Sequence, residues 1–282
     1  MPDAQDPFRA PVPFGRTGLT LFRLGLGASY GAPARAYEEA FERGVNYFYW
    51  GTRRHPEMGE AIRRIARGGG RARLHVAVQS YSPFAGLLAP SVGIALKRLR
   101  LDYADFLILG LWNRRLPQSV VDTVARLKEE GRVRHVVVSA HDRPMFETHL
   151  RQGVADAIMV RYNAAHRGAE GEVFPHVAGA RGTRPGVITY TTTRWGHLLD
   201  PARLPRTERA PRGRDCYRFS LSHPAVDMVL AGPASAAELR EALAALEEGP
   251  MSEEELAWMR RVGDAVHGTR AADNAFKAVV RS

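Results

Sequence analysis

The residues able to do chemistry are polar, charged and aromatic side chains that directly follow strand-like runs of the sequence. They are Tyr49, Trp50, Arg53, Arg54 and His55, then Gln79, Trp112, Asn113 and His141, and finally Arg161, Asn163 and Arg194. Arginine pairs with carboxylates and phosphates and stacks on rings, so several arginines with aromatic walls predict a small anionic ligand. Tyr49, Arg54, His55, Gln79 and His141 are the catalytic candidates, and among them the tyrosine and the two histidines can donate or accept protons.

The substrate-binding candidates are Trp50, Arg53, Trp112, Asn113, Arg161 and Asn163. Structural alternatives stand beside them. Trp50 is also suited to closing the top of a barrel. The arginines at 53 and 54 are also placed to pair with Glu57 or Glu60 at a helix start. A single histidine is more often solvated or structural than catalytic.

The strand-like runs recur along the whole chain and alternate with longer segments of helical periodicity. They span 21–27, 45–49, 74–79, 105–109, 133–139, 157–162, 186–191 and 226–232. This alternation predicts βα units around a parallel sheet. Eight evenly spaced strands favour a closed barrel over an open doubly wound sheet, because LGLGASYG is a poor match to the phosphate-binding turn of the open sheet.

The predicted fold is therefore α/β: a (β/α)8 TIM barrel with an N-terminal β-hairpin around Phe14 to Leu19 and an extra C-terminal helix from Ser252 to about His267. We expect one domain over residues 1–282, with the barrel at about 20–250 and the C-terminal helix and tail at 251–282. In such barrels the active site lies at the C-terminal ends of the strands. The candidate residues should therefore meet at one mouth.

Composition narrows the class of protein. No apolar run of about 18 residues and no signal-like N-terminus occurs, so we expect a cytoplasmic protein that does not span a membrane. The lone cysteine, Cys216, excludes an intramolecular disulfide and a cysteine-based metal cage, and no metal is expected. The net charge of +10 comes mainly from scattered arginines, without a basic tail or nucleic-acid motif, so no nucleic-acid partner is expected. The oligomeric state does not follow from the sequence.

Six segments together resemble the aldo-keto reductase superfamily in order and spacing. They are FGRTGLTLFRLGLG, AFERGVNYF, LKRLRLDYADFLIL, LKEEGRVRHVVVS, VRYN and LSHPAVDMVLAGPASAAELREAL. The resemblance implies a (β/α)8 barrel that binds NADPH, or less often NADH, at its mouth and reduces a carbonyl with an Asp, a Tyr, a Lys and a His. In that chemistry the tyrosine protonates the alkoxide left by hydride addition, and the lysine lowers its pKa.

The chain departs from the family at all four of these positions. Tyr49 stands at the aspartate position, Arg54 at the tyrosine position within a shorter loop, Gln79 at the lysine position and Gly110 at the histidine position. The three lysines of the chain lie in predicted helices and in the tail. Loss of the proton donor and of the groups that tune it predicts that ordinary carbonyl reduction is severely impaired.

The cofactor positions of the family are altered less. Gly232 and the helix start after it keep the backbone N–H groups that bind phosphate, while Ser235 stands where a basic residue is common. Ser139 is retained after the fifth strand, but Ala140 replaces the usual nicotinamide-binding asparagine. Arg194 is a further candidate for holding a phosphate or carboxylate. Binding of NADP or NAD stays open on these residues.

Three functions fit the sequence. The first is an aldo-keto-reductase-like oxidoreductase with a non-standard active site, which binds a nicotinamide dinucleotide and acts on a small anionic or aromatic metabolite. The second is a cofactor-independent lyase, isomerase or dehydratase built in the emptied barrel mouth. The third is a catalytically silent binding or regulatory protein. Family resemblance places the oxidoreductase first, and the loss of all four residues keeps the other two close.

Overall fold

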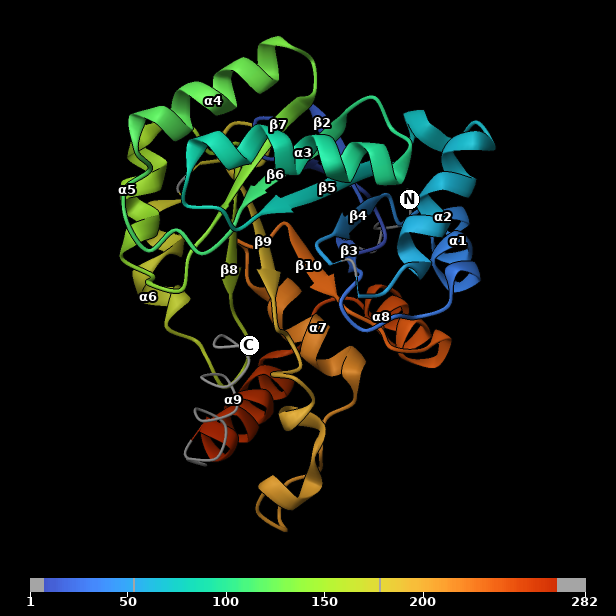
Figure 1. Ribbon diagram of the computed structural model, residues 1–282. Coiled ribbons are helices and arrows are strands. Elements are labelled where there is room, and N and C mark those ends of the chain that lie inside the picture. Colours follow the sequence, from blue (N-terminus) through green and yellow to red (C-terminus); the bar gives the residue numbers. More distant parts are fainter. Residues whose placement is uncertain (1–7, 53, 178, 268–282) are drawn as a thin grey trace, which may run out of the picture.

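The computed structural model of the chain describes residues 8–52, 54–177 and 179–267. Its centre is a closed barrel of eight parallel strands, in the order β10-β3-β4-β5-β6-β7-β8-β9 (Figure 1). The strands are β3 (Leu24–Gly27), β4 (Tyr47–Trp50), β5 (His75–Ser80), β6 (Ala104–Leu109), β7 (Val133–Ser139), β8 (Ala157–Arg161), β9 (Gly186–Tyr190) and β10 (Met228–Ala231). The predicted (β/α)8 barrel is confirmed, and each strand ends within one residue of its predicted C-terminal end.

The first barrel strand begins later than predicted. Leu21 belongs to the N-terminal hairpin, in which β1 (Val12–Phe14) pairs antiparallel with β2 (Leu19–Leu21). This confirmed hairpin closes the N-terminal end of the barrel. Phe14 is fully buried there, and its ring lies edge-on to that of Phe106 at a centroid distance of 5.8 Å.

Helices cover the outside of the barrel. They are α1 (Ala34–Glu42), α2 (Glu57–Arg67), α3 (Ala85–Leu99), α4 (Gln118–Glu129), α5 (Met145–Gln152), α6 (Ala169–Glu172), α7 (Gly213–Ser222), α8 (Ala236–Glu248) and α9 (Glu253–His267). Short 3-10 helices span Gly70–Ala72, Phe174–His176, His197–Leu199 and Pro201–Arg203. The predicted C-terminal helix is α9; Ser252 stands just before it because its Oγ caps the helix by accepting from the Glu255 N–H at 3.2 Å.

Apolar residues form two layers, because successive side chains of a strand point to opposite faces. The inner layer fills the barrel and contains Tyr47, Tyr49, Phe106, Ile108 and Ile188 among others. The outer layer lies between the strands and the helices and contains the intervening strand residues. This alternation decides which residues at the strand ends face the mouth.

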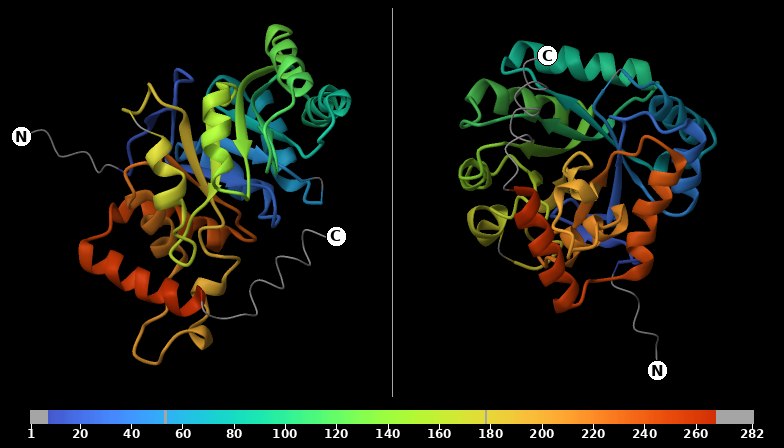
Figure 2. Two further views of the ribbon diagram at one scale, coloured as in Figure 1. Left: turned by 90° about the vertical axis from the view of Figure 1, so that its left-hand side faces the viewer. Right: turned by 90° about the horizontal axis from the view of Figure 1, so that it is seen from below.

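Helix α9 docks beside the C-terminal end of the barrel, on the loop that follows β8. In Figure 1 strands β8, β9 and β10 run downward and α9 lies beneath them, and the view from below in Figure 2 shows α9 and the segment after β9 near this end. Arg167 donates to Asp264 Oδ1 at 2.7 Å, and a ring nitrogen of His267 lies 2.7 Å from the carbonyl oxygen of Ala165. The backbone of Gly263 lies directly against the Ala164 carbonyl. The C-terminal helix is therefore part of the wall of the mouth.

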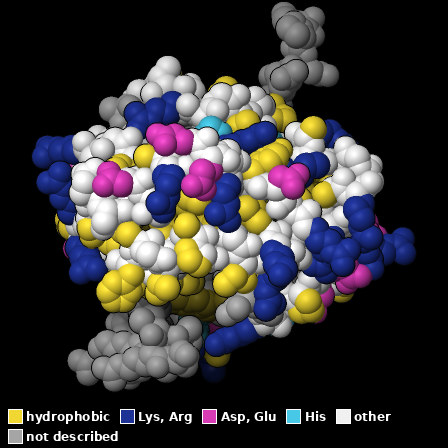
Figure 3. Space-filling model, turned by 45° about the horizontal axis from the view of Figure 1, so that its top comes forward, with side chains coloured by type: hydrophobic (Ala, Val, Ile, Leu, Met, Phe, Trp, Pro, Cys, Tyr) yellow, Lys and Arg dark blue, Asp and Glu magenta, His cyan; other side chains and the backbone are white. Residues whose placement is uncertain are grey.

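The surface carries its basic residues in a scattered pattern. On the face shown in Figure 3, Lys and Arg side chains are spread out and several lie beside Asp or Glu. Arg64, for example, pairs with both Glu38 and Glu60. Among the described residues, no helix is long and apolar enough to cross a membrane.

Candidate functional site

The floor of the barrel mouth consists of the last inward-facing residue of several strands. Tyr49 of β4 belongs to the inner layer, and Tyr190 of β9 packs against it. By the two-residue period, Gln79 follows the inward-facing Ala77 and Arg161 follows Met159. Arg161 and Tyr190 are register partners in the parallel pair β8·β9. The mouth therefore brings together the predicted residues Tyr49, Gln79 and Arg161, and adds Tyr190, which the sequence analysis did not select.

Side chains fill the space that the family's histidine would take. A Cβ built on Gly110 would lie 2.8 Å from two ring atoms of Tyr81 and closer still to Nε2 of Gln79. Tyr81 is 58% exposed at the rim, and Gln79 Oε1 is buried without a hydrogen-bond partner among the described residues. Gln79 and Tyr81 thus fill the space beside Gly110, and the buried amide oxygen of Gln79 has no hydrogen-bond partner among the described residues.

The tyrosines of the mouth are held in their protonated form. Burial, followed by the neighbouring Tyr81, raises the pKa of Tyr49 well above its usual value. Burial also raises the pKa of Tyr190 to about 12, although Arg161 and the Ser139 hydroxyl oppose this rise. A general acid works best when its pKa lies near the working pH. Tyr49 is therefore suited to donating a hydrogen bond and poorly suited to the proton transfer that a cation-tuned tyrosine performs.

Positive charge gathers on the β8 side of the mouth. Burial and then Arg161 lower the pKa of His141. Burial lowers the pKa of His166 to about 3, with further lowering by Arg161 and Arg194. Both imidazoles are therefore neutral at pH 7, mainly because they are buried, and the positive charge of Arg161 that adds to this effect also favours an anion.

The backbone is strained in two loops that border the mouth. Five described residues other than glycine have positive φ angles, and four of them follow strands here: Leu111 after β6, and Thr191, Arg194 and Trp195 after β9. Such conformations are costly, above all for a β-branched residue like Thr191 (φ 59°), and they concentrate at functional sites. The strain supports a specific role for the mouth.

Arg194, a predicted cofactor-binding residue, is buried against the C-terminal end of α9. Its side chain is 2% exposed, and Nη1 donates to the carbonyl oxygen of Val266 at 2.8 Å, at the C-terminal end of α9. A guanidinium at this end of a helix is favoured by the helix dipole and by the open carbonyl groups. The position disfavours direct contact between Arg194 and a phosphate.

Three of the substrate-binding candidates are buried and contact other parts of the protein. Trp50 and Trp112 belong to the outer layer, and the indole nitrogen of Trp50 faces Gly59 of α2. Asn163 is fully buried; its Nδ2 donates to the Thr191 carbonyl at 2.8 Å, and its Oδ1 accepts from two backbone N–H groups of its own loop. These contacts disfavour direct ligand binding by Trp50, Trp112 and Asn163, while Asn163 fixes the loops that border the mouth.

The remaining candidates lie in the rim loops. Asn113 Oδ1 accepts from the backbone N–H groups of His141 and Asp142, at 2.7 and 2.9 Å, and so joins the loops after β6 and β7. Arg54 is exposed, and the ring of His55 packs over Gly31. Arg53 lies outside the described residues.

The start of α8, where a phosphate site was expected, holds the Ser235 hydroxyl and the Glu238 carboxylate. Ser235 Oγ accepts from the Glu238 N–H at 3.2 Å, and Glu238 Oε2 accepts from the Ala234 N–H at 2.8 Å. The ring of Tyr30 covers Gly232, where an added Cβ would lie 2.9 Å from it. A phosphate here would have to displace a carboxylate of its own sign. The Glu238 carboxylate therefore disfavours an adenosine phosphate at the start of α8.

Among the described residues, no group of three or more His, Cys, Asp or Glu side chains is arranged to hold a metal ion.

The fold is shared with solved structures of the family that the sequence resembles. Aldo-keto reductase AKR11C1 from Bacillus halodurans matches in its holo form with a TM-score of 0.74 and 22% identity, over 91% of this chain and 96% of that chain. Its apo form matches with a TM-score of 0.73 and the same identity and coverage. No protein-family model matches the sequence, and no curated protein matches it. The comparisons thus establish the aldo-keto reductase fold.

Proposed function

We propose that the protein binds a small organic anion in the barrel mouth and acts on it without nicotinamide chemistry. One observation carries the proposal: Arg161 ends β8 facing the mouth, where burial and then the charge of Arg161 lower the pKa of His141 and His166. A guanidinium pairs with a carboxylate or phosphate through paired N–H donors. The ligand is therefore a carboxylate or phosphate ester of metabolite size.

The same residues supply the elements of a proton-transfer reaction. Arg161 holds the anionic group of the substrate and stays charged at every relevant pH. His141, kept neutral by burial and by Arg161, accepts a proton from the carbon or hydroxyl group next to that anion. Tyr49 remains protonated and donates a hydrogen bond to the substrate oxygen on which charge develops. An isomerase, lyase or dehydratase uses these steps.

Binding of a nicotinamide dinucleotide is the second candidate, and the fold itself favours it. The matched structure is described as an aldo-keto reductase in a holo form, and Gly232 is retained after β10. The Glu238 carboxylate at the α8 N-terminus and the replaced catalytic positions favour the first candidate.

The single cysteine, Cys216, is a free buried thiol, which supports a location in a reducing compartment such as the cytoplasm.

Ligand titrations distinguish these candidates. Trp195 is 44% exposed in the loop after β9, whereas Trp50, Trp112 and Trp258 are at most 9% exposed. A ligand in the mouth should therefore change mainly the fluorescence emission of Trp195. Phenyl phosphate, benzoate, NADPH and NADH are each titrated into the wild-type protein and into Arg161→Gln. The matched control is Arg35→Gln, whose arginine pairs with Glu39 on the exposed face of α1.

We expect the small anions to bind the wild type and the control alike, and Arg161→Gln to bind them about tenfold or more weakly, because a charge-assisted contact is lost. Proton transfer is then followed by NMR with a carboxylate that carries a hydrogen α to a carbonyl group, such as pyruvate, as exchange of that hydrogen for deuterium, which His141→Gln should abolish. Micromolar binding of NADPH, with equal anion affinity in wild type and Arg161→Gln, contradicts the proposal and favours the second candidate.

A further inference from the structure

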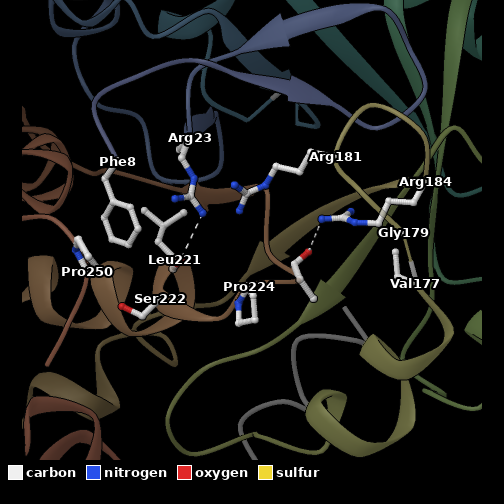
Figure 4. A pocket seen from close by; sticks show the side chains of 11 residues that line it. Phe8, Arg23, Val177, Gly179, Arg181, Arg184, Leu221, Ser222, Pro224 and Pro250 are labelled. Atoms are coloured by element: carbon white, nitrogen blue, oxygen red, sulfur yellow. Dashed lines mark hydrogen bonds between the residues drawn. The ribbon is translucent and has the colours of Figure 1, made fainter. Parts of the chain in front are cut away.

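A hollow lies at the opposite end of the barrel from the mouth. It has a volume of about 560 Å3 and is lined by residues just before β3, β9 and β10 and by the end of α7. Three arginines line it: Arg23, Arg181 and Arg184 (Figure 4). Figure 4 shows the guanidinium groups of Arg23 and Arg181 pointing toward one another, with that of Arg184 turned toward the same space.

One buried carboxylate serves this group. Asp227 is fully buried, and both of its oxygens accept from Arg184, at 2.7 and 2.8 Å. Oδ1 also accepts from Arg181 Nε at 3.0 Å, and Oδ2 from the Val187 N–H at 2.8 Å. A carboxylate offers about four acceptor sites, so Asp227 is saturated. Its single negative charge is fully matched by Arg184.

The positive charge of Arg181 therefore exceeds what Asp227 needs. The other described contact of its guanidinium is a neutral one, from Nη2 to the Val226 carbonyl at 3.2 Å. Arg181 remains 33% exposed, so its side chain is open to solvent within the hollow. Arg23 lies beside it and is held by the Leu221 and Val226 carbonyls. Burial and then the charge of Arg181 lower the pKa of Arg23 to about 10, which is the effect that crowded positive charge has on a neighbour.

The walls of the hollow are suited to an organic ligand. Phe8, Val177, Leu221 and Pro224 supply apolar surface, and Arg23 stacks on the Phe8 ring at 4.6 Å. No acidic side chain is among the described lining residues. A bound anion would balance the positive charge of Arg181, which the Asp227 carboxylate does not need. Carboxylates and phosphates are the anions that match guanidinium geometry.

We propose that this hollow is a second binding site, which takes a small organic anion with an apolar or aromatic portion. Arg181 is its specificity-determining residue, because it combines surplus charge with exposure to the hollow. Arg184 and Asp227 position it. The site lies on the face opposite the mouth and does not depend on the function proposed for Arg161.

Hydrogen exchange with mass spectrometry locates the ligand. Phenyl phosphate, benzoate and inorganic phosphate are compared at equal ionic strength, and affinities are measured by calorimetry. We expect phenyl phosphate or benzoate to slow exchange in segments 179–187 and 221–229, with inorganic phosphate binding more weakly because it leaves the apolar walls uncovered. The order of phenyl phosphate and benzoate separates a phosphate ester from a carboxylate ligand.

Three variants make the test specific. Arg181→Gln keeps the Arg184–Asp227 pair and should weaken binding about tenfold or more, whereas Arg181→Lys keeps the charge and should fall between Arg181→Gln and the wild type. Arg161→Gln should leave this site unchanged, which separates it from the mouth. Absence of protection in both segments at millimolar ligand overturns the proposal, and so does wild-type affinity in both Arg181 variants.

Discussion

Replacing Gly263 by alanine should destabilise the protein, against the usual effect of this change in a helix. Alanine is better than glycine in a helix interior by about 1 kcal/mol. Here, however, the added Cβ would lie 2.9 Å from the Ala165 backbone nitrogen and closer still to the Ala164 carbonyl. These are backbone atoms, held by the loop that carries Asn163, so α9 has to move.

The magnitude follows from what α9 buries. Overpacking costs about 1–3 kcal/mol. Helix α9 also holds Trp258, Met259, Val262 and Val266 in the core, and each such side chain contributes about 1.5–3 kcal/mol when fully buried. A partial shift of the helix therefore outweighs the propensity gain, and we expect a net loss of about 2–3 kcal/mol. For a chain of this size that corresponds to a fall in Tm of roughly 4–12 °C.

Urea unfolding followed by circular dichroism measures this change. Gly86→Ala is the matched control, because Gly86 also lies in a helix, in the first turn of α3, and an added Cβ there meets nothing within 4 Å. The control should be neutral or slightly stabilising. A Gly263→Ala protein as stable as wild type would refute the close docking of α9 on the loop after β8.

Two further predictions concern buried titratable groups. Because burial holds the pKa of His166 at about 3 in the folded protein, against about 6.5 when unfolded, the unfolded chain binds more protons between these values. The free energy of unfolding should therefore fall as pH drops from 7 to 5, and less so in His166→Asn; an unchanged slope in urea titrations contradicts the burial of this ring. Cys216 is 1% exposed, and burial followed by Asp215 raises the pKa of its thiol. It should react with a thiol reagent such as DTNB only as fast as the protein unfolds, so rapid labelling of the native protein would oppose this placement.

The sequence predicted where strands end more accurately than which way their last side chains face. The βα alternation locates all eight C-terminal ends, because the change from strand to helix period is local. Orientation requires counting back from a buried residue: Tyr47 is inside, so Tyr49 is inside and Trp50 is outside. The same count from Ile188 places Tyr190 in the mouth, although nothing in its local motif selects it.

Other outcomes depend on contacts that no local pattern contains. Arg194 meets Val266 across 72 residues of sequence, so its docking on α9 follows from the tertiary fold. The Glu238 carboxylate at the start of α8 is a different case, because the local sequence contained a pattern that predicts it. The segment Ser235 to Glu238 has the S-x-x-E pattern of a capping box, in which serine and glutamate satisfy the free N–H groups of a helix start.

The chemistry proposed for the mouth depends on the position of its cationic side chain, Arg161. In the family that the sequence resembles, a lysine on the third barrel strand tunes a tyrosine acid; here that position is Gln79, and Arg161 supplies the charge from β8. Arginine does not give up its proton in a protein, so Arg161 can pair with an anion but cannot transfer a proton. Burial, and then the neighbouring Tyr81, raise the pKa of Tyr49. Under the proposed function, proton transfer would fall to a neutral imidazole, and His141, whose pKa is lowered by burial and then by Arg161, would perform it on an anion bound by Arg161.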